Sequence, residues 1–204
     1  MATSGTTAFD LSIEEIIQEA YERCGMATTS GYSLRSARTS LNLLFAEWAN
    51  RGIHLWKVSL HENTLVSGQA EYAVDSAVSD VLEAFVSTTA AGANSINTQD
   101  VSLTKIDRSA YAALPNKLAK GQPSQYYVDR QEIPKIYLYQ APDLNTYTVL
   151  KYYVIKRIQD AGAYGNDADV VFRFLPCMVA GLAYYLAMKN APTLVQQNKL
   201  IYED

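Results

Sequence analysis

The stretch TLVSGQAEYAV, from Thr64 to Val74, marks the point at which the sequence changes from a helical to a strand pattern. Ser67-Gly68 is a typical turn pair, and apolar and polar residues alternate around it. Alternation is the period of a half-buried β-strand, because successive side chains point to opposite faces. We therefore expect two short strands joined by a turn.

The strand pattern recurs on both sides of this turn. A strand is expected to start at Val58, and five more are expected at 81–87, 101–106, 125–129, 135–140 and 147–154. A short helix from Arg108 to Leu114 interrupts them and stops at Pro115. The small, polar stretch from Thr88 to Thr98 predicts a mobile loop.

Helices are expected before this β segment. Ser12 and Glu15 have the spacing of a capping box, and the apolar residues that follow recur at helical spacing until Gly25. A glycine at that position is typical of a helix end. Ser33 is expected to cap a second helix that ends near Gly52, so the two helices should form a hairpin.

Helices are also expected after the β segment. Asp167 or Asp169 is placed to cap a helix towards Met188, with a kink or restart at Pro176. Pro192 is expected in the first turn of a final helix that reaches the C-terminus.

The order of these elements predicts an α+β fold. We expect an antiparallel helical bundle, made of the N-terminal helix hairpin and the C-terminal helices, with an inserted antiparallel β domain. Residues 8–57 and 161–204 would form the two parts of the bundle, and residues 58–160 the inserted domain.

The composition favours a folded protein that does not grip duplex DNA. The 204 residues are 49% hydrophobic and carry a net charge of -4, whereas proteins that bind DNA phosphates are normally basic. The apolar stretch from Val170 to Met188 contains Arg173 and Pro176, so we expect a buried helix and not a membrane span.

The sequence contains no clear catalytic or ligand-binding pattern. Its two cysteines and two histidines lack metal-ligand spacing, and it has neither a Gly-x-Ser-x-Gly motif nor a glycine-rich phosphate loop. We therefore expect no catalytic residues, no metal and no cofactor. Paired carboxylates of a hydrolase stay open as an alternative, although the neighbouring Glu14 and Glu15 would diverge on a helix.

Charge is divided unevenly along the β segment. Residues 61–100 contain six acidic residues and no Lys or Arg, whereas residues 101–160 contain nine basic and five acidic residues. These charges either pair within one subunit or form opposite-sign flanks for a head-to-tail contact between copies. The second interpretation gives these subunit-interface candidates: Glu71, Asp75, Asp80, Glu83, Lys105, Arg108, Lys117 and Arg130.

Several motifs, in their order and spacing, resemble a known family. They include LNLLFAEW (41–48), VSGQAEY (66–72), KLAKGQPSQYYVDR (117–130) and GLAYYLA (181–187). In these the chain resembles the head-to-tail connector adaptors, also called tail accessory factors or head completion proteins, of short-tailed bacteriophages.

The resemblance implies a structural, non-enzymatic virion protein of the neck or tail, assembled in the host cytoplasm. Family members form a ring, typically of twelve copies, that joins the portal protein to the tail nozzle or tail fibres. The ring surrounds the DNA exit channel, and DNA passes without specific binding. Portal contact would involve the C-terminal residues Leu200, Ile201, Tyr202, Glu203 and Asp204. The alternatives are a peptidoglycan-cleaving hydrolase of the virion and another neck or tail-tube subunit.

Overall fold

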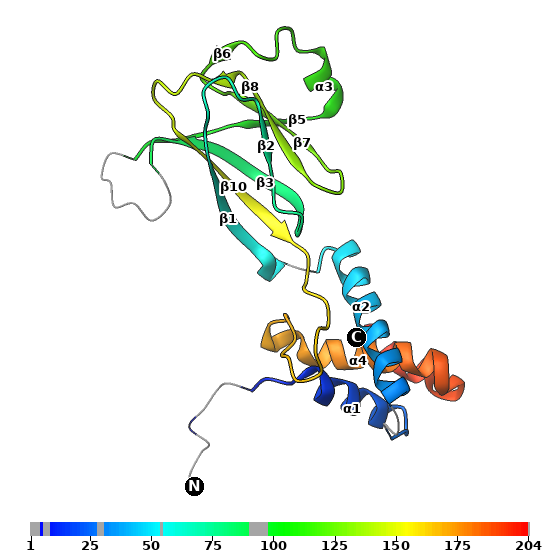
Figure 1. Cartoon of the computed structure of the whole chain (residues 1–204). Helices are drawn as coiled ribbons and strands as arrows, with labels where there is room; N and C mark the ends of the chain where they lie inside the picture. The colour runs from blue at the N-terminus through cyan, green and yellow to red at the C-terminus, as the bar shows by residue number, and fades with distance from the viewer. Residues whose placement is uncertain (1–4, 6–8, 28–30, 54, 90–97, 204) are drawn as a thin grey trace. The chain divides into compact units, whose positions relative to one another are not determined.

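A computed structural model describes residues 5, 9–27, 31–53, 55–89 and 98–203 of the chain (Figure 1). The chain divides into two compact units, Met1–Ile53 with Ile158–Asp204, and His54–Arg157. We call them the helical unit and the β unit. Most of the loop expected from Thr88 to Thr98 lies outside the described residues.

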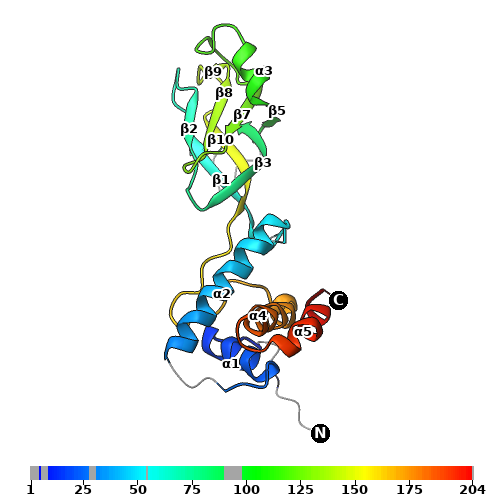
Figure 2. The same cartoon turned by 90° about the vertical axis from the view of Figure 1, so that its right-hand side faces the viewer.

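The helical unit is built around one apolar helix. It contains α1 (Ile13–Arg23), α2 (Gly31–Asn50), α4 (Leu175–Asn190) and α5 (Val195–Glu203), with the short helices η2 (Phe172–Phe174) and η3 (Pro192–Leu194). Helix α4 is buried around much of its circumference, and α1, α2 and α5 each pack against it (Figure 2). The helix is central because nearly all of its side chains are apolar.

The core of this unit comes from the apolar stripes that the sequence displays. Ile13, Ile16 and Ile17 of α1 are buried, as are Leu41, Leu44 and Trp48 of α2. The expected capping box is confirmed, because Ser12 accepts a hydrogen bond from the backbone of Glu15 and the Glu15 side chain bonds back to Ser12. Gly25 then ends this segment at a φ of 67°, a conformation that favours glycine.

The expected antiparallel helical bundle with an N-terminal hairpin is wrong. The fold is a mixed α+β arrangement in which strands separate α2 from α4, and helix α3 (Arg108–Ala113) lies among the strands. Helix α1 packs mainly on α4, and α2 runs across both (Figure 1). The physical reason is that α4 offers apolar surface on several sides, so it attracts α1 more than the neighbouring helix in the sequence does.

Two helix starts also differ from expectation. Helix α2 begins at Gly31, so Ser33 lies inside its first turn and is not the cap. Helix α4 begins at Leu175, with Pro176 in its first turn, and neither Asp167 nor Asp169 caps it. A proline in the first turn costs no hydrogen bond, because the first N–H groups of a helix have no partner within it.

The β unit contains two four-stranded sheets. One has the order β1 (Val58–Thr64), β10 (Val149–Lys156), β3 (Val78–Ser87) and β4 (Asp100–Ser102). The other has the order β2 (Glu71–Ala73), β8 (Lys135–Tyr139), β7 (Gln125–Asp129) and β5 (Thr104–Ile106). A further pair joins β6 (Lys120–Gly121) to β9 (Ala141–Pro142), and η1 (Leu55–Lys57) precedes β1.

Alternate side chains of the two sheets form one hydrophobic core. Leu150, Tyr152 and Val154 of β10 are buried in it, and so are Tyr126 of β7 and Leu138 of β8. The strand period therefore places every second residue inside, as the sequence pattern predicts.

The strand pairing departs from the expected antiparallel arrangement in two places. Strands β5 and β7 pair in parallel, and so do β6 and β9. The single strand expected over residues 101–106 is split into β4 and β5, which belong to different sheets. The buried Leu103 lies at this crossing, and its N–H donates to the carbonyl of Ala84.

Candidate interaction surfaces

Asp80 is the centre of a charged cluster within the β unit. It accepts hydrogen bonds from Nε and Nη2 of Arg130, each at 2.9 Å, and Nζ of Lys105 lies 3.4 Å from Oδ1. Burial acts to raise the pKa of Asp80, but the hydrogen bond from Arg130 and the two positive charges outweigh it and lower the pKa. Three expected interface residues are thus brought together inside one chain.

Two more of the expected acidic residues also have partners in their own chain. Nζ of Lys135 lies 2.6 Å from Oε1 of Glu71, and the hydrogen bond from Lys135 lowers the pKa of that carboxyl. Asp75 lies 3.8 Å from Nζ of Lys156. Sequence reasoning missed both lysines, because the pairing of β2 with β8 and of β3 with β10 is not visible before the strands are aligned.

The other candidates on the β unit lie at its surface. Glu83 and Arg108 are exposed, on β3 and at the start of α3. Lys117 donates to the carbonyls of Ala112 and Leu114, each at 3.0 Å. Contact of these residues with a neighbouring copy stays a prediction.

The C-terminal candidates differ in exposure. Leu200 and Ile201 of α5 are 56% and 51% exposed, so they are available for contact. Tyr202 is partly buried, and its hydroxyl accepts a hydrogen bond of 3.0 Å from Nε1 of Trp48. Glu203 lies 3.7 Å from Lys199. Asp204 lies outside the described residues.

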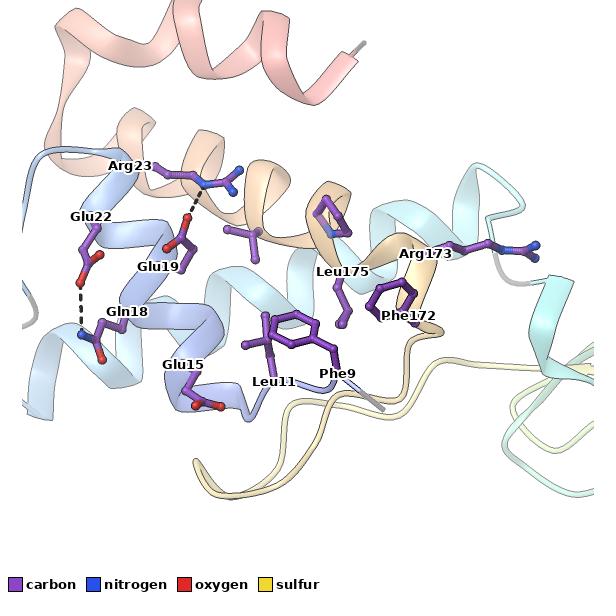
Figure 3. Close-up of a pocket in the computed structure, with 12 residues that line it drawn as sticks. Phe9, Leu11, Glu15, Gln18, Glu19, Glu22, Arg23, Phe172, Arg173 and Leu175 are labelled. Carbon is purple, nitrogen blue, oxygen red and sulfur yellow. Dashed lines mark hydrogen bonds and ion pairs between the residues drawn. The ribbon is translucent and has the colours of Figure 1, made fainter. Parts of the chain in front are cut away.

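A groove of about 610 Å³ runs along the helical unit between α1 and the start of α4 (Figure 3). Its apolar part includes Phe9 and Phe172, whose rings meet edge to face with centroids 6.1 Å apart. These two side chains are 59% and 62% exposed. Large exposed aromatic rings in a concave site are typical of docking surfaces. We call this feature the α1–α4 groove; it is lined by Phe9, Leu11, Glu15, Gln18, Glu19, Glu22, Arg23, Phe172, Arg173, Leu175, Pro176 and Val179.

Acidic side chains of α1 line one side of the groove. Glu15 accepts hydrogen bonds from the N–H and the hydroxyl of Ser12, both at 2.8 Å, and the backbone bond is the main cause of its lowered pKa. Glu19 pairs with Arg23 at 2.9 Å, and Glu22 accepts from the neutral Gln18 at 3.1 Å. A general acid needs a raised pKa, so Glu15 is unsuited to the acid role in a hydrolase.

Sequence reasoning missed the groove, because its two walls come from distant parts of the chain. The available signal was the pair Phe9 and Phe172, two large apolar residues that come shortly before α1 and α4. Within the described ranges, no group of His, Cys, Asp or Glu could hold a metal ion. No helix in that same part of the chain is long and apolar enough to cross a membrane.

Comparison with known proteins gives one family. No curated protein matches the chain. The family model described as SU10 adaptor protein matches residues 12–203. This match spans both the helical unit and the β unit, and it agrees with the adaptor resemblance of the sequence motifs. The chain therefore belongs to the SU10 adaptor protein family and is a phage head–tail adaptor, a structural component of the virion.

Proposed function

We propose that this adaptor forms a ring, typically of twelve copies, that joins the portal protein to the tail nozzle or tail fibres. The ring surrounds the DNA exit channel and breaks no covalent bond. The observation that carries the proposal is the family match over residues 12–203, which includes both units of the chain.

The charge of the protein supports a role around the DNA channel. The chain has a net charge of -4, and the basic residues of the β unit are partly neutralised by acidic partners such as Asp80 and Glu71. An acidic protein repels DNA phosphates, so DNA passes without being retained.

The outer face of α5 is the proposed contact with the portal. Leu200 and Ile201 expose adjacent apolar side chains there, and exposed apolar residues at the centre of an interface contribute much of its binding energy. Glu83 and Arg108 of the β unit are exposed and remain proposed contacts between neighbouring copies.

A mass measurement with and without the portal ring of the same phage tests this function. We expect the mixture to contain a portal ring that carries one adaptor per site, with a matching symmetry in electron micrographs. The double variant Leu200→Asp, Ile201→Asp should bind at least tenfold more weakly. Gln159→Asp, at an exposed position of the helical unit outside α5, should bind normally. Absence of a complex with the unaltered chain would overturn the proposal, and a symmetry other than that of the portal would favour a different neck subunit.

A further inference from the structure

We propose that the α1–α4 groove of one copy receives the outer face of α2 from the next copy in the ring. The inference rests on the proposed ring and names the two surfaces that hold it together. Both surfaces belong to the helical unit, so each copy offers one groove and one α2 face.

The outer face of α2 is an exposed stripe. We define it as Tyr32, Arg35, Thr39, Leu43 and Ala46, all of which are exposed. Their spacing of three and four residues places them on one side of a helix. Tyr32 and Leu43 are 82% and 54% exposed, which is unusual for large apolar side chains on an otherwise amphipathic helix.

The shape of the stripe suits the groove. A helix that docks into an apolar groove uses anchors spaced by three, four or seven residues. Tyr32 and Leu43 supply such anchors three turns apart, since eleven residues span about 16 Å of helix. The exposed rings of Phe9 and Phe172 supply apolar surface for an anchor on the groove side (Figure 3).

The charges of the two surfaces are complementary. Glu15, Glu19 and Glu22 of α1 line the groove, and the exposed stripe of α2 carries Arg35. Glu22 has the neutral Gln18 as its hydrogen-bond partner, so it can accept a positive charge from outside without losing an ion pair. Complementary charges at the rim of an interface favour the correct register and orientation.

The two surfaces lie on opposite sides of the helical core. Helix α1 buries Ile13, Ile16 and Ile17 and turns its acidic side to the groove, whereas α2 buries Leu41 and Leu44 against the core and turns its stripe away. In Figure 3 the groove residues lie in front of α4 and α2 passes behind it. Contact between unlike surfaces on opposite sides is head-to-tail, and it closes into a ring when the rotation permits.

Cross-linking in the assembled complex tests the contact. Leu43→Cys and Phe172→Cys are placed together in the full chain, with Cys177→Ser to remove the partly exposed native thiol. After assembly on the portal ring, a short bismaleimide should produce a ladder of cross-linked copies, whereas Leu43→Cys alone should give none. A matched control pairs Phe172→Cys with Gln159→Cys, an exposed position of the helical unit that lies outside the groove, the α2 stripe and α5.

The outcomes separate this inference from the proposed function. A complete ring that gives no ladder with Leu43→Cys and Phe172→Cys overturns the inference and leaves the function standing. A ladder with the Gln159→Cys control, or a cross-link from Phe172→Cys to the portal protein, likewise shows another occupant of the groove. Absence of any ring overturns both.

A charge exchange gives a second, independent readout. Arg35→Glu is expected to weaken ring assembly about threefold, and adding Glu22→Arg in the same chain should restore it. Arg108→Glu, on the exposed surface of the β unit, is the matched control and should not be rescued by Glu22→Arg. Failure of the rescue, with the ring otherwise intact, contradicts the contact.

Discussion

Replacing Asp80 by Asn tests whether the charges of the β unit are balanced within one chain. Arg130 donates two hydrogen bonds of 2.9 Å to Asp80, and Nζ of Lys105 lies 3.4 Å away. A hydrogen bond to a charged group contributes about 1.5–3 kcal/mol, but the Arg130 side chain is 60% exposed, and solvent screening reduces its share. We expect Asp80→Asn to lower the free energy of unfolding at neutral pH by about 1–2 kcal/mol.

The pH dependence of this effect has a definite sign. The pKa of Asp80 lies below its ordinary value: burial acts to raise it, but the Arg130 hydrogen bond and the charges of Lys105 and Arg130 outweigh burial and lower it. The stabilisation is therefore present above the unfolded pKa of about 3.9 and is lost as pH falls through the lower, folded pKa. The difference between the unaltered chain and Asp80→Asn should shrink below about pH 4.

Urea unfolding of the isolated full chain, followed by circular dichroism at several pH values, measures both effects. The matched control is Glu83→Gln, at an exposed position of the same strand, which should change the free energy of unfolding by less than about 0.5 kcal/mol. If Asp80→Asn left the isolated chain as stable as before but weakened the ring, the reasoning would be refuted, and pairing across copies would be the better explanation.

Three further predictions concern the two cores. Tyr202→Phe removes the acceptor of the 3.0 Å hydrogen bond from Trp48 Nε1. It should lower the free energy of unfolding by about 1–2 kcal/mol, measured by urea unfolding followed by tryptophan fluorescence. An unchanged urea midpoint would contradict this. Gly181→Val should lower the melting temperature, because even a Cβ at this position would lie 2.9 Å from Leu44 Cδ1 and overpacking costs about 1–3 kcal/mol of stability. An unchanged melting temperature would show that α2 shifts to make room for the new side chain. Burial, with nearby acidic groups, raises the pKa of Tyr126 to about 12. The hydroxyl therefore stays protonated in the folded state when it ionises in the unfolded chain, and the protein loses stability from about pH 10 to 12. Tyr126→Phe should reduce this loss in unfolding experiments at alkaline pH, and an equal loss in both proteins would contradict the prediction.

Local features of the fold could be predicted because local chemistry determines them. The capping box at Ser12 and Glu15 is present, and the alternation over residues 125–129 corresponds to β7 with the same bounds. The turn at Ser67-Gly68 lies between β1 and β2, with Gly68 at a φ of 80°. In each case a few neighbouring residues supply both the signal and the contacts that stabilise it.

The helix packing could not be predicted, because it depends on contacts between distant residues. Adjacency in the sequence suggested a hairpin of α1 with α2, but α4 competes for the same apolar stripe of α1. The parallel pairs β5–β7 and β6–β9 likewise depend on which strand ends meet in space. Periodicity predicts which face of a helix or strand is buried, but not which element packs against that face.

The contact of the candidate charged residues with a neighbouring copy stays a prediction. The uneven charge of residues 61–160 pointed to Asp80, Lys105 and Arg130, and the structure brings these three side chains together. The α1–α4 groove was missed, because Phe9 and Phe172 meet only after the chain has folded.

The antiparallel pairing of β1 with β10 has a consequence for the history of the protein. Val58 and Ile155 face each other in that pairing, close to the two points where the chain enters and leaves the β unit. Paired strands are about 4.8 Å apart, so the two junctions are neighbours in space. Recombination between related phages can therefore exchange the whole β unit as one segment, while the helical unit keeps its own contacts.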